Sequence, residues 1–440
     1  MTRYTGIVSR RRFMATTGGG SAVALLASAC GGAPASAPAK TTGPVTVTYM
    51  SNLPETHPEG EARLSLLKEF TSTNPSQITV NLTEAVASIT LDKIKALAAG
   101  GTPPDLAYFA YYDTPGLYIS GATIDVDDEL KSEKDWGKQR ADMFPAMLES
   151  SQWAGKLVGL PGYTNNQGMI YNLGILSQNN VAVPQKGWTW DDFKTSAAKM
   201  TRPPDRWGAN IAWTAWNVYL GTAGSRPMSK DNRKMQLDTP EMQQVMEFFQ
   251  GLIKNIIMPA DGRNNFYQEA KNDVAYENQG PYRIPTLRQR TAPAFGVVHA
   301  PVHPTKKEIH APNGGHNIAV FKEVSTERRH AAALTAKWMN AVHAQAIMCI
   351  KATSLPVSKA ALESKELQDY LKTDPELKGF IDLAPNGYRW PPLPSYAAIT
   401  KAANDGVAAI MKNEIGIKDG LSKIQREAQV LLDEDVKLMK

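Results

Sequence analysis

Apolar and polar residues alternate in two short stretches near the start of the chain, at residues 45–49 and 78–82. This alternation predicts β-strands with one buried face. Between the two stretches, Leu64, Leu67 and Phe70 recur at helical spacing, which predicts a helix. The pattern therefore predicts a strand, a helix and a second strand in succession.

The same order of elements continues along the chain. Apolar positions predict a helix over residues 91–99, which Gly100 and Gly101 end. A further strand is predicted over residues 105–109. Strands joined by helices of this length form parallel βαβ units. We therefore expect an α/β fold whose ligand site lies beyond the carboxyl ends of the strands.

Amphipathic helical patterns dominate the second half of the chain. They predict helices over residues 190–200, 240–254 and 324–346, and a last helix over residues 409–438 that is interrupted around residues 416–420. Thr189 or Asp191 is expected to cap the first of these helices. A short strand is predicted over residues 317–321. The sequence shows no solenoid repeat.

The N-terminus reads as an export signal. Three consecutive arginines, Arg10 to Arg12, precede an apolar segment at residues 22–27 that is far shorter than the roughly 20 residues needed to span a bilayer. We therefore predict a signal peptide of the twin-arginine type over residues 1–29, while the general secretory route remains an alternative. Residues 26–30 resemble a lipobox ending at Cys30, the expected lipidation site. Simple cleavage without lipid attachment is the alternative.

Composition and charge narrow the class of protein. A flexible tether is predicted over residues 30–43, which are rich in small residues and proline. A chain of 440 residues is long enough for two or more domains. The formal charge of +5 falls to +1 without the first 29 residues, which carry four arginines and no acid, so nucleic acid is not an expected partner. Cys349 lies in an apolar run and is expected to be a buried thiol.

Several local motifs occur in an order that resembles a known family. They are Ala98–Leu106, Gly159–Pro161 leading to Ile170–Asn172, Trp188–Phe193, Asp273–Tyr282, Gly314–His316 and Ser354–Val357. Together they resemble the family 1 extracellular solute-binding proteins, the maltose-binding-protein-like group. The resemblance covers roughly residues 44–440. Tyr276 departs from it, because the family commonly has methionine there.

The resemblance implies a two-lobed periplasmic-binding-protein-like α/β fold of type II, with mixed sheets flanked by helices and a ligand cleft between the lobes. One lobe is expected to contain residues 44–164 and 290–342, and the other residues 165–289 and 343–440. Such proteins close around their solute by hinge motion. The resemblance further implies a monomeric lipoprotein, anchored outside the cell membrane, that delivers a carbohydrate to the permease of an ABC importer.

Sugar binding requires aromatic platforms and short polar side chains, because a sugar presents hydroxyl groups around weakly polar faces. Such residues follow the predicted strands. The expected ligand-binding residues are Ser51, Asn52, Tyr111, Tyr112, Asp113, Tyr163, Asn165, Asn166, Trp213, Trp216, Gln279, Tyr282, Gly315, His316, Arg389 and Trp390. Gln167, Tyr219, Arg283 and Tyr396 are further candidates. Trp216 and Tyr219 are three residues apart on a predicted helix, so at least one of them is expected in the core.

Other chemistries have weaker support in the sequence. A glycerophosphodiester or polyol is the alternative ligand. Arg283 and Arg389 support the phosphodiester, because a guanidinium group matches the charge and geometry of a phosphate group. A secreted glycoside hydrolase is the alternative of another class, since Glu59 and Asp113 are two carboxylates of the kind that such chemistry uses. His310 and His316 lack a third ligand at metal spacing, so no metal is expected. No cofactor motif is present, and we expect a binding protein that is not an enzyme.

Overall fold

The computed structural model describes residues 43–51, 53–85, 91–260, 274–289, 294–322 and 324–439. Residues 38–440 form one compact unit, to which all described elements belong. The predicted signal peptide, the predicted lipidation site Cys30, nearly all of the predicted tether and the predicted ligand residue Asn52 lie outside the described residues.

Strands from distant parts of the chain form the larger sheet, which has six strands in the order β12-β11-β3-β1-β2, with β6 paired to β11. β1 is parallel to β2 and to β3, which confirms the predicted βαβ units. β11 runs antiparallel to β3 and β6, so the sheet is mixed. The bounds are β1 Val45–Ser51, β2 Ile78–Ala85, β3 Leu106–Ala110, β6 Leu160–Asn166, β11 Ala311–Val320 and β12 Gly387–Tyr388.

Helices with apolar faces cover the larger sheet. Leu66 and Phe70 of α1, Ala332 of α13 and Met348 of α14 share a buried core with Val47 of β1. We call this sheet with its helices the first lobe. Its helices and small hairpin are α1 Pro58–Thr73, α2 Leu91–Ala99, α3 Thr114–Ile119, α4 Val126–Leu130, α5 Trp136–Asp142, α6 Pro145–Glu149, β4 Gln152–Trp153, β5 Lys156–Leu157, α13 Thr326–Met339 and α14 Val342–Ala352.

A smaller sheet of four strands, in the order β10-β7-β9-β8, forms the second lobe. β7 is antiparallel to β9 and β10, whereas β8 is parallel to β9. All six side chains of β9 are buried, which places this strand inside the lobe. The bounds are β7 Gly168–Asn172, β8 Trp207–Asn210, β9 Val274–Gln279 and β10 Phe295–Val298.

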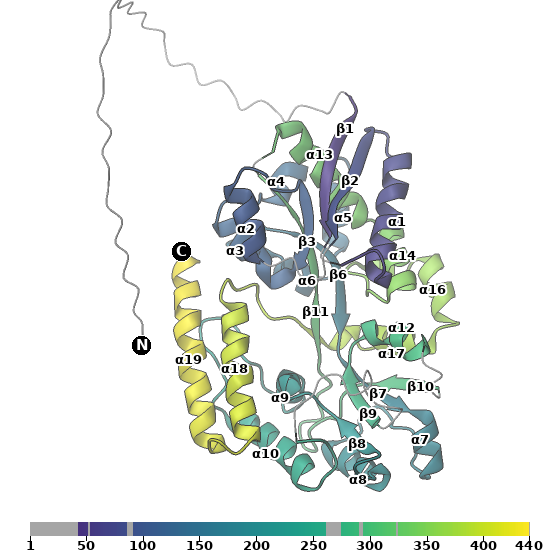
Figure 1. Cartoon of the computed structure of the whole chain (residues 1–440), viewed down its shortest axis with the longest axis vertical. Coiled ribbons are helices and arrows are strands. Elements are labelled where there is room, and N and C mark those ends of the chain that lie inside the picture. The colour runs from purple at the N-terminus through teal and green to yellow at the C-terminus, as the bar shows by residue number, and fades with distance from the viewer. Residues whose placement is uncertain are drawn as a thin grey trace, which may run out of the picture. The chain divides into compact units, whose positions relative to one another are not determined.

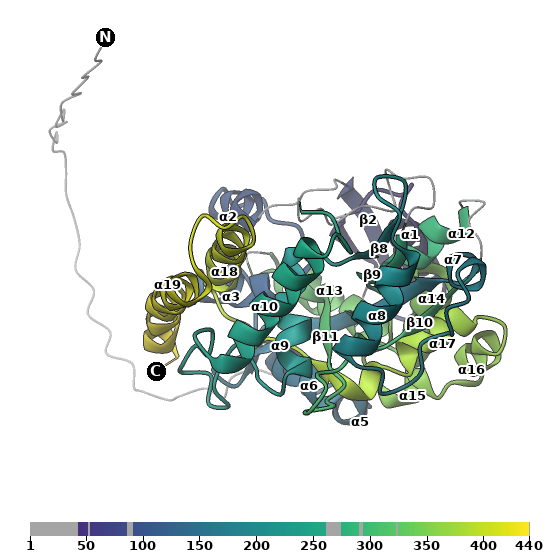
Figure 2. The same cartoon turned by 90° about the horizontal axis from the view of Figure 1, so that it is seen from below.

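Helices of the second lobe bury an aromatic core that contains Phe193 of α8 and Phe249 of α10. The predicted cap of α8 is Thr189, whose hydroxyl group and Asp192 exchange hydrogen bonds in a capping box. In Figures 1 and 2, α18 and α19 lie side by side, and their apolar residues join the same core. The helices of this lobe are α7 Leu173–Gln178, α8 Trp190–Met200, α9 Trp216–Thr222, α10 Pro240–Lys254, α18 Tyr396–Met411 and α19 Ile417–Leu438. A further group shares a separate core with β7 and with Cys349 of α14, so it bridges the two lobes: α12 Ile284–Gln289, α15 Lys359–Leu362, α16 Lys365–Leu371 and α17 Pro375–Ile381.

Extended chain segments connect the two lobes. Only Gln167 separates β6 of the first lobe from β7 of the second. Figure 1 shows β6 and β11 running from the first lobe toward the second. The segment from β12 to α18 passes to the second lobe near the C-terminal end of the chain. The chain therefore crosses between the lobes more than once, as the two-lobed fold requires.

Three predicted elements differ from the structure. The helix predicted over residues 324–346 is two helices, because Asn340 ends α13 and its side chain donates a 2.5 Å hydrogen bond to the carbonyl oxygen of Pro161. The strand predicted over residues 317–321 begins earlier, at Ala311, because β11 must also pair with β6. In the last helical region the interruption lies at residues 412–416 and separates α18 from α19.

The predicted division of the chain between lobes also differs in two places. Residues 290–342 were assigned to the first lobe, but β10 pairs with β7 in the smaller sheet. Residues 343–440 were assigned to the second lobe, but Met348 of α14 packs in the core of the first. In both cases the lobe of an element depends on which distant element it packs against. The apolar pattern of the element itself does not encode that partner.

Candidate functional site

The first polar segment after β3 lies where the βαβ pattern predicts a ligand site. Tyr111, Tyr112 and Asp113 form a short 3-10 helix immediately after that strand ends. The ring of Tyr112 stacks on the ring of Tyr396, with 4.2 Å between centroids and 18° between planes. Tyr396 is the first residue of α18, so this contact joins the first lobe to a helix of the second.

Tryptophans extend this contact into an aromatic cluster, which we define as Tyr111, Tyr112, Trp216, Trp390 and Tyr396. Trp390 meets Tyr396 edge-on at 5.6 Å and Trp216 edge-on at 6.2 Å between centroids. The Trp216 indole Nε1 donates a 2.9 Å hydrogen bond to Asn404 Oδ1. Trp216 therefore has a structural partner within the second lobe.

Two buried indole donors at this place have no such partner. Trp213 and Trp390 are 6% and 3% exposed, and neither Nε1 atom makes a hydrogen bond among the described residues. Trp213 lies in a short 3-10 helix that contacts α18, beside the aromatic cluster. A buried donor without an acceptor is unfavourable in a folded protein.

Asp113 supplies the carboxylate of the site. Burial raises the pKa of this side chain to about 6, and the attraction of Lys95 offsets part of that shift. A half-buried carboxylate next to an aromatic ring accepts hydrogen bonds strongly when it is ionised. The aromatic cluster, the two indole donors and Asp113 together offer the combination of ring faces and polar atoms that a sugar requires.

Arg389 is buried against the ring of Tyr111. Its guanidinium group is 4.4 Å from the ring centroid of Tyr111, and it donates hydrogen bonds to Ser150 Oγ at 2.9 Å and to the carbonyl oxygen of Gly314 at 2.6 Å. Burial lowers the pKa of Arg389 to about 10, still well above neutral pH. No ion pair of Arg389 occurs in the described part of the chain. Ser150, which holds this side chain, carried no recognisable signal in the sequence.

Gly315 has a structural requirement of its own. Its φ angle is +131°, and a Cβ atom there would collide with the carbonyl oxygen of Tyr163 and with Arg389 Nη2. Only glycine adopts this conformation readily and leaves this space. The predicted residue Gly315 therefore positions β11 against β6 and Arg389.

Tyr163 and His316 form a hydrogen bond between β6 and β11, through the tyrosine hydroxyl group and His316 Nδ1. Burial and then the charges of Arg63 and Arg389 lower the pKa of His316 to about 3, so the imidazole is neutral at physiological pH. The guanidinium group of Arg63 lies 3.9 Å from the ring centroid of Tyr108 in the same buried network. Both predicted residues thus take part in a polar network within the first lobe.

The remaining predicted residues divide between the lobe junction and other places. At the junction, Asn165 Oδ1 accepts a 3.0 Å hydrogen bond from the Gly314 amide, and Asn166 Nδ2 donates one of 2.8 Å to the Phe380 carbonyl oxygen. Tyr282 is 49% exposed and donates a 2.9 Å hydrogen bond to Gln279 Oε1 at the end of β9.

Several candidates already have partners. Ser51 Oγ donates a 2.7 Å hydrogen bond to the Leu53 carbonyl oxygen. Arg283 lies 3.5 Å from the carboxylate of Glu277, so its charge is already countered. Glu59 forms an ion pair with the buried Arg63. Tyr219 is fully buried, which confirms that at least one member of the Trp216 and Tyr219 pair belongs to the core.

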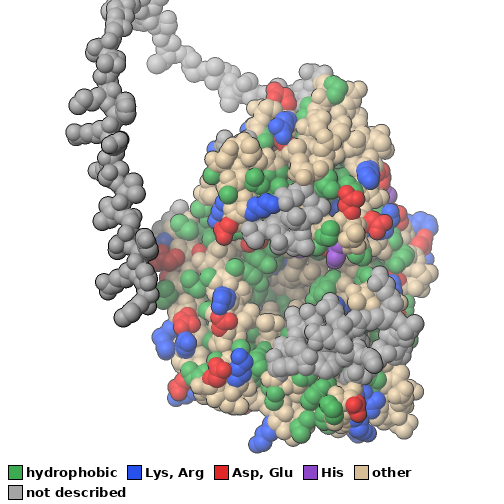
Figure 3. All heavy atoms as spheres, in the orientation of Figure 1, with side chains coloured by type: hydrophobic (Ala, Val, Ile, Leu, Met, Phe, Trp, Pro, Cys, Tyr) green, Lys and Arg blue, Asp and Glu red, His purple; other side chains and the backbone are tan. Residues whose placement is uncertain are grey.

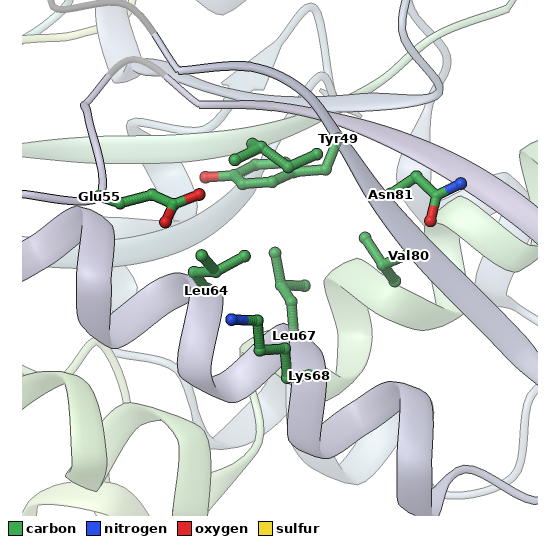
Figure 4. Close-up of a pocket in the computed structure, with 8 residues that line it drawn as sticks. Tyr49, Glu55, Leu64, Leu67, Lys68, Val80 and Asn81 are labelled. Carbon is green, nitrogen blue, oxygen red and sulfur yellow. The ribbon is translucent and has the colours of Figure 1, made fainter.

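Figure 3 shows that this face of the molecule is hollowed between the first lobe and the second lobe. A separate pocket of about 420 Å³ lies on the first lobe between α1 and β2, where Figure 4 shows Leu64 and Leu67 projecting from the helix toward Tyr49. None of the predicted ligand residues that the structure describes lines that pocket. No group of three metal-ligating side chains occurs within the described ranges, and none of the helices described there is long and apolar enough to cross a membrane.

Comparison with solved structures places this fold among known ones. The cyclic alpha-maltosyl-1,6-maltose binding protein of Arthrobacter globiformis superposes with a TM-score of 0.78 at 18% identity, covering 89% of this chain and 100% of that one. UgpB of Mycobacterium tuberculosis, in complex with glycerophosphocholine, gives a TM-score of 0.75 at 19% identity, covering 90% and 100%. These similarities confirm the expected two-lobed α/β fold.

Sequence comparison gives the family. The maltotriose-binding protein of Pyrococcus abyssi is 25% identical over 348 residues, which are 76% of this chain and 72% of that protein. A probable ABC transporter-binding protein of Deinococcus radiodurans is 23% identical over 268 residues, which are 56% of this chain and 62% of that protein. A family model described as bacterial extracellular solute-binding protein matches residues 65–378, more than half of the chain. This protein therefore belongs to the bacterial extracellular solute-binding proteins.

Proposed function

We propose that this protein captures a small carbohydrate between its two lobes and delivers it to an ABC importer. The observation that carries the proposal is the aromatic cluster with the unpartnered indole donors of Trp213 and Trp390 beside Asp113. Ring faces suit the C–H faces of a sugar, while the indole donors and the carboxylate suit its hydroxyl groups. The related proteins named for maltotriose and for a cyclic maltosyl sugar support a sugar as the solute.

A binding screen tests this proposal directly. Maltotriose, other oligosaccharides, monosaccharides and polyols are added to the purified mature protein, and thermal unfolding is followed. A ligand of the native state stabilises it by about 2.7 kcal/mol at a concentration one hundred times its Kd. We expect a sugar to raise the midpoint of unfolding and to give a saturable calorimetric titration. A screen in which no sugar has an effect contradicts the proposal.

A glycerophosphodiester is the second candidate, and two observations favour it. Arg389 is a buried cation for which the described residues supply no carboxylate, and a related structure contains glycerophosphocholine. Arg283 supports this candidate less, because Glu277 already neutralises it. Glycerophosphocholine is therefore included in the screen. Saturable binding of this compound, without an effect of any sugar, would replace the first proposal by the second.

The same proposal holds that the protein binds its solute without turning it over. Of the two carboxylates considered for a glycosidase, Glu59 is paired with Arg63 and is not free to act as an acid or base. Incubation with oligosaccharides, followed by chromatography, is expected to return the starting sugar intact. New shorter sugars that appear in proportion to protein concentration would contradict a pure binding role.

Anchoring through Cys30 is part of the proposed function. The lipobox-like sequence at residues 26–30 and the following small, proline-rich segment motivate it. We expect Cys30→Ala to move the protein from the membrane to the soluble extracytoplasmic fraction, with solute affinity unchanged because Cys30 precedes both lobes. Cell fractionation with an alkaline wash measures this. Retention of the variant on washed membranes would require a different anchor.

A further inference from the structure

A pocket of about 570 Å³ lies at the lobe junction and adjoins the aromatic cluster of the proposed solute site, with which it shares Trp390. Its walls come from four places: the end of α6 with the β4 strand, the loop between α9 and α10, the segment from β12 toward α18, and Met439 after α19. Trp390 and Arg389 line it, but Tyr112, Asp113, Trp213 and Tyr396 do not. The pocket is therefore built from both lobes.

The charge of this pocket is strongly unbalanced. Arg226, Lys230 and Arg389 line it, and Glu149 is the single carboxylate among the described residues of its wall. None of these three cations forms an ion pair within the described part of the chain. The guanidinium group of Arg226 is held over the ring of Tyr388 at 4.9 Å, and Tyr388 also lines the pocket. Cations gathered in one cavity without counter-charges attract an anion from solution.

Arg389 adds a buried hydrogen-bond donor to that charge. This side chain is only 6% exposed, and its Nε atom makes no hydrogen bond among the described residues. Its Nη1 atom already binds Ser150 Oγ, a second residue of the pocket wall. A guanidinium group offers several donors in one plane, a geometry that matches the oxygens of a phosphate or carboxylate group.

We propose that this pocket binds a small oxyanion, a phosphate group in particular, at the junction of the two lobes. Arg226 and Lys230 come from the second lobe, Ser150 from the first, and Arg389 from the segment that connects them. An anion bound there would bridge parts that move relative to one another during closure. By linkage, its occupancy would then change the affinity of the protein for its solute.

Calorimetric titration of the mature protein with inorganic phosphate tests the proposal, with sodium chloride at equal ionic strength as the blank. We expect saturable binding that Arg226→Gln combined with Lys230→Gln weakens roughly tenfold, since charge-assisted bonds to phosphate are lost. Lys194→Gln combined with Lys199→Gln removes the same charge from exposed positions on α8, away from the pocket. This control should bind phosphate as the unmodified protein does.

Three outcomes would overturn the proposal: no saturable binding of phosphate, an equal loss in the control variant, or competitive displacement of phosphate by glycerophosphocholine or maltotriose. The third would place the anion in the solute cleft. Failure of the protein to bind any sugar leaves the phosphate titration interpretable, so this proposal and the proposed function fail separately. Titration with glycerol phosphate then distinguishes a phosphate ester from the free ion, because a pocket for free phosphate alone would exclude the ester.

Discussion

At the scale of single residues, Trp213 and Trp216 form a matched pair. Both indoles are buried and three residues apart, yet only Trp216 has a hydrogen-bond acceptor, Asn404, among the described residues. The structure thus separates a tryptophan whose donor bonds within the fold from one whose donor has no acceptor among the described residues. Their ring areas are the same, so the two roles can be compared directly.

We expect Trp213→Phe to weaken sugar binding by roughly three- to tenfold, because it removes one hydrogen bond worth about 0.5–1.5 kcal/mol. Its effect on stability should be small, since the lost donor had no acceptor in the protein. Trp216→Phe is the control: it leaves Asn404 without its donor and should lower stability by about 1 kcal/mol, while the phenyl ring keeps an aromatic face in the cluster and limits the change in affinity. Calorimetry and thermal unfolding measure both variants. Equal affinity of Trp213→Phe and the unmodified protein would remove Trp213 from the site.

The raised pKa of Asp113 predicts a dependence on pH. Burial raises it to about 6 in the folded protein, from an ordinary value of 3.8. The ionised side chain accepts hydrogen bonds from sugar hydroxyl groups more strongly than the protonated one, so affinity should fall as the pH drops through about 6. Calorimetry between about pH 5 and pH 7.5 measures this. Asp113→Asn should bind more weakly at neutral pH and show a flat profile over that range.

The raised pKa of Asp113 should also make the free energy of unfolding depend on pH, but with the opposite sign to the affinity. Because the folded state binds the proton more tightly, the free energy of unfolding falls as the pH rises from about 4 to about 6. Asp113→Asn lacks this contribution and should be less sensitive to pH over that interval. A profile that is identical in both proteins would show that Asp113 titrates normally.

At the scale of elements, α8 has the clearest start signal in the chain. The Thr189 hydroxyl group accepts a hydrogen bond from the Asp192 amide at 3.2 Å, while Asp192 Oδ2 accepts one from the Thr189 amide at 2.8 Å. Thr189→Ala should lower the free energy of unfolding by about 1 kcal/mol, a typical loss for an N-cap. Lys194→Ala, at an exposed position of the same helix, should leave it unchanged. Denaturant unfolding measures both, and equal stabilities would mean that the cap is dispensable.

Helices and strands that are marked by their own apolar periodicity and end signals were predictable from the sequence. The bounds of α2, α8 and α10 match the predicted helices, β1 and β2 lie at the predicted alternations, and β3 lies within one residue of the strand predicted over residues 105–109. The break between α13 and α14 was missed because its cause is a bond from Asn340 to Pro161, far away in the sequence. The ends of strands located Tyr112 and Asp113 correctly, but no local pattern indicated that Tyr112 would stack on Tyr396. The ligand contacts themselves remain predictions.

At the scale of the whole molecule, the fold predicts closure. The proposed site takes Tyr112 and Asp113 from the first lobe and Trp213 from the second, so a bound solute would stabilise the closed form over the open form. We expect saturating ligand to lower the radius of gyration in solution X-ray scattering. A sugar that fails in the binding screen, added at the same concentration, is the control. A scattering curve unchanged by a bound ligand would contradict hinge closure.

The position of β11 within the larger sheet has a consequence for how the protein is made. β11 pairs with both β3 and β6, so the sheet of the first lobe lacks a central member until residues 311–320 have left the ribosome. Until then β3 and β6 have no central partner strand and the apolar residues around them stay exposed. Such long-range strand pairing slows folding and exposes the nascent chain to aggregation. The sheet of the first lobe therefore cannot be completed before the strands of the smaller sheet have been synthesised. An export route that accepts folded proteins, as the predicted twin-arginine signal would specify, would let this sheet form before the chain crosses the membrane.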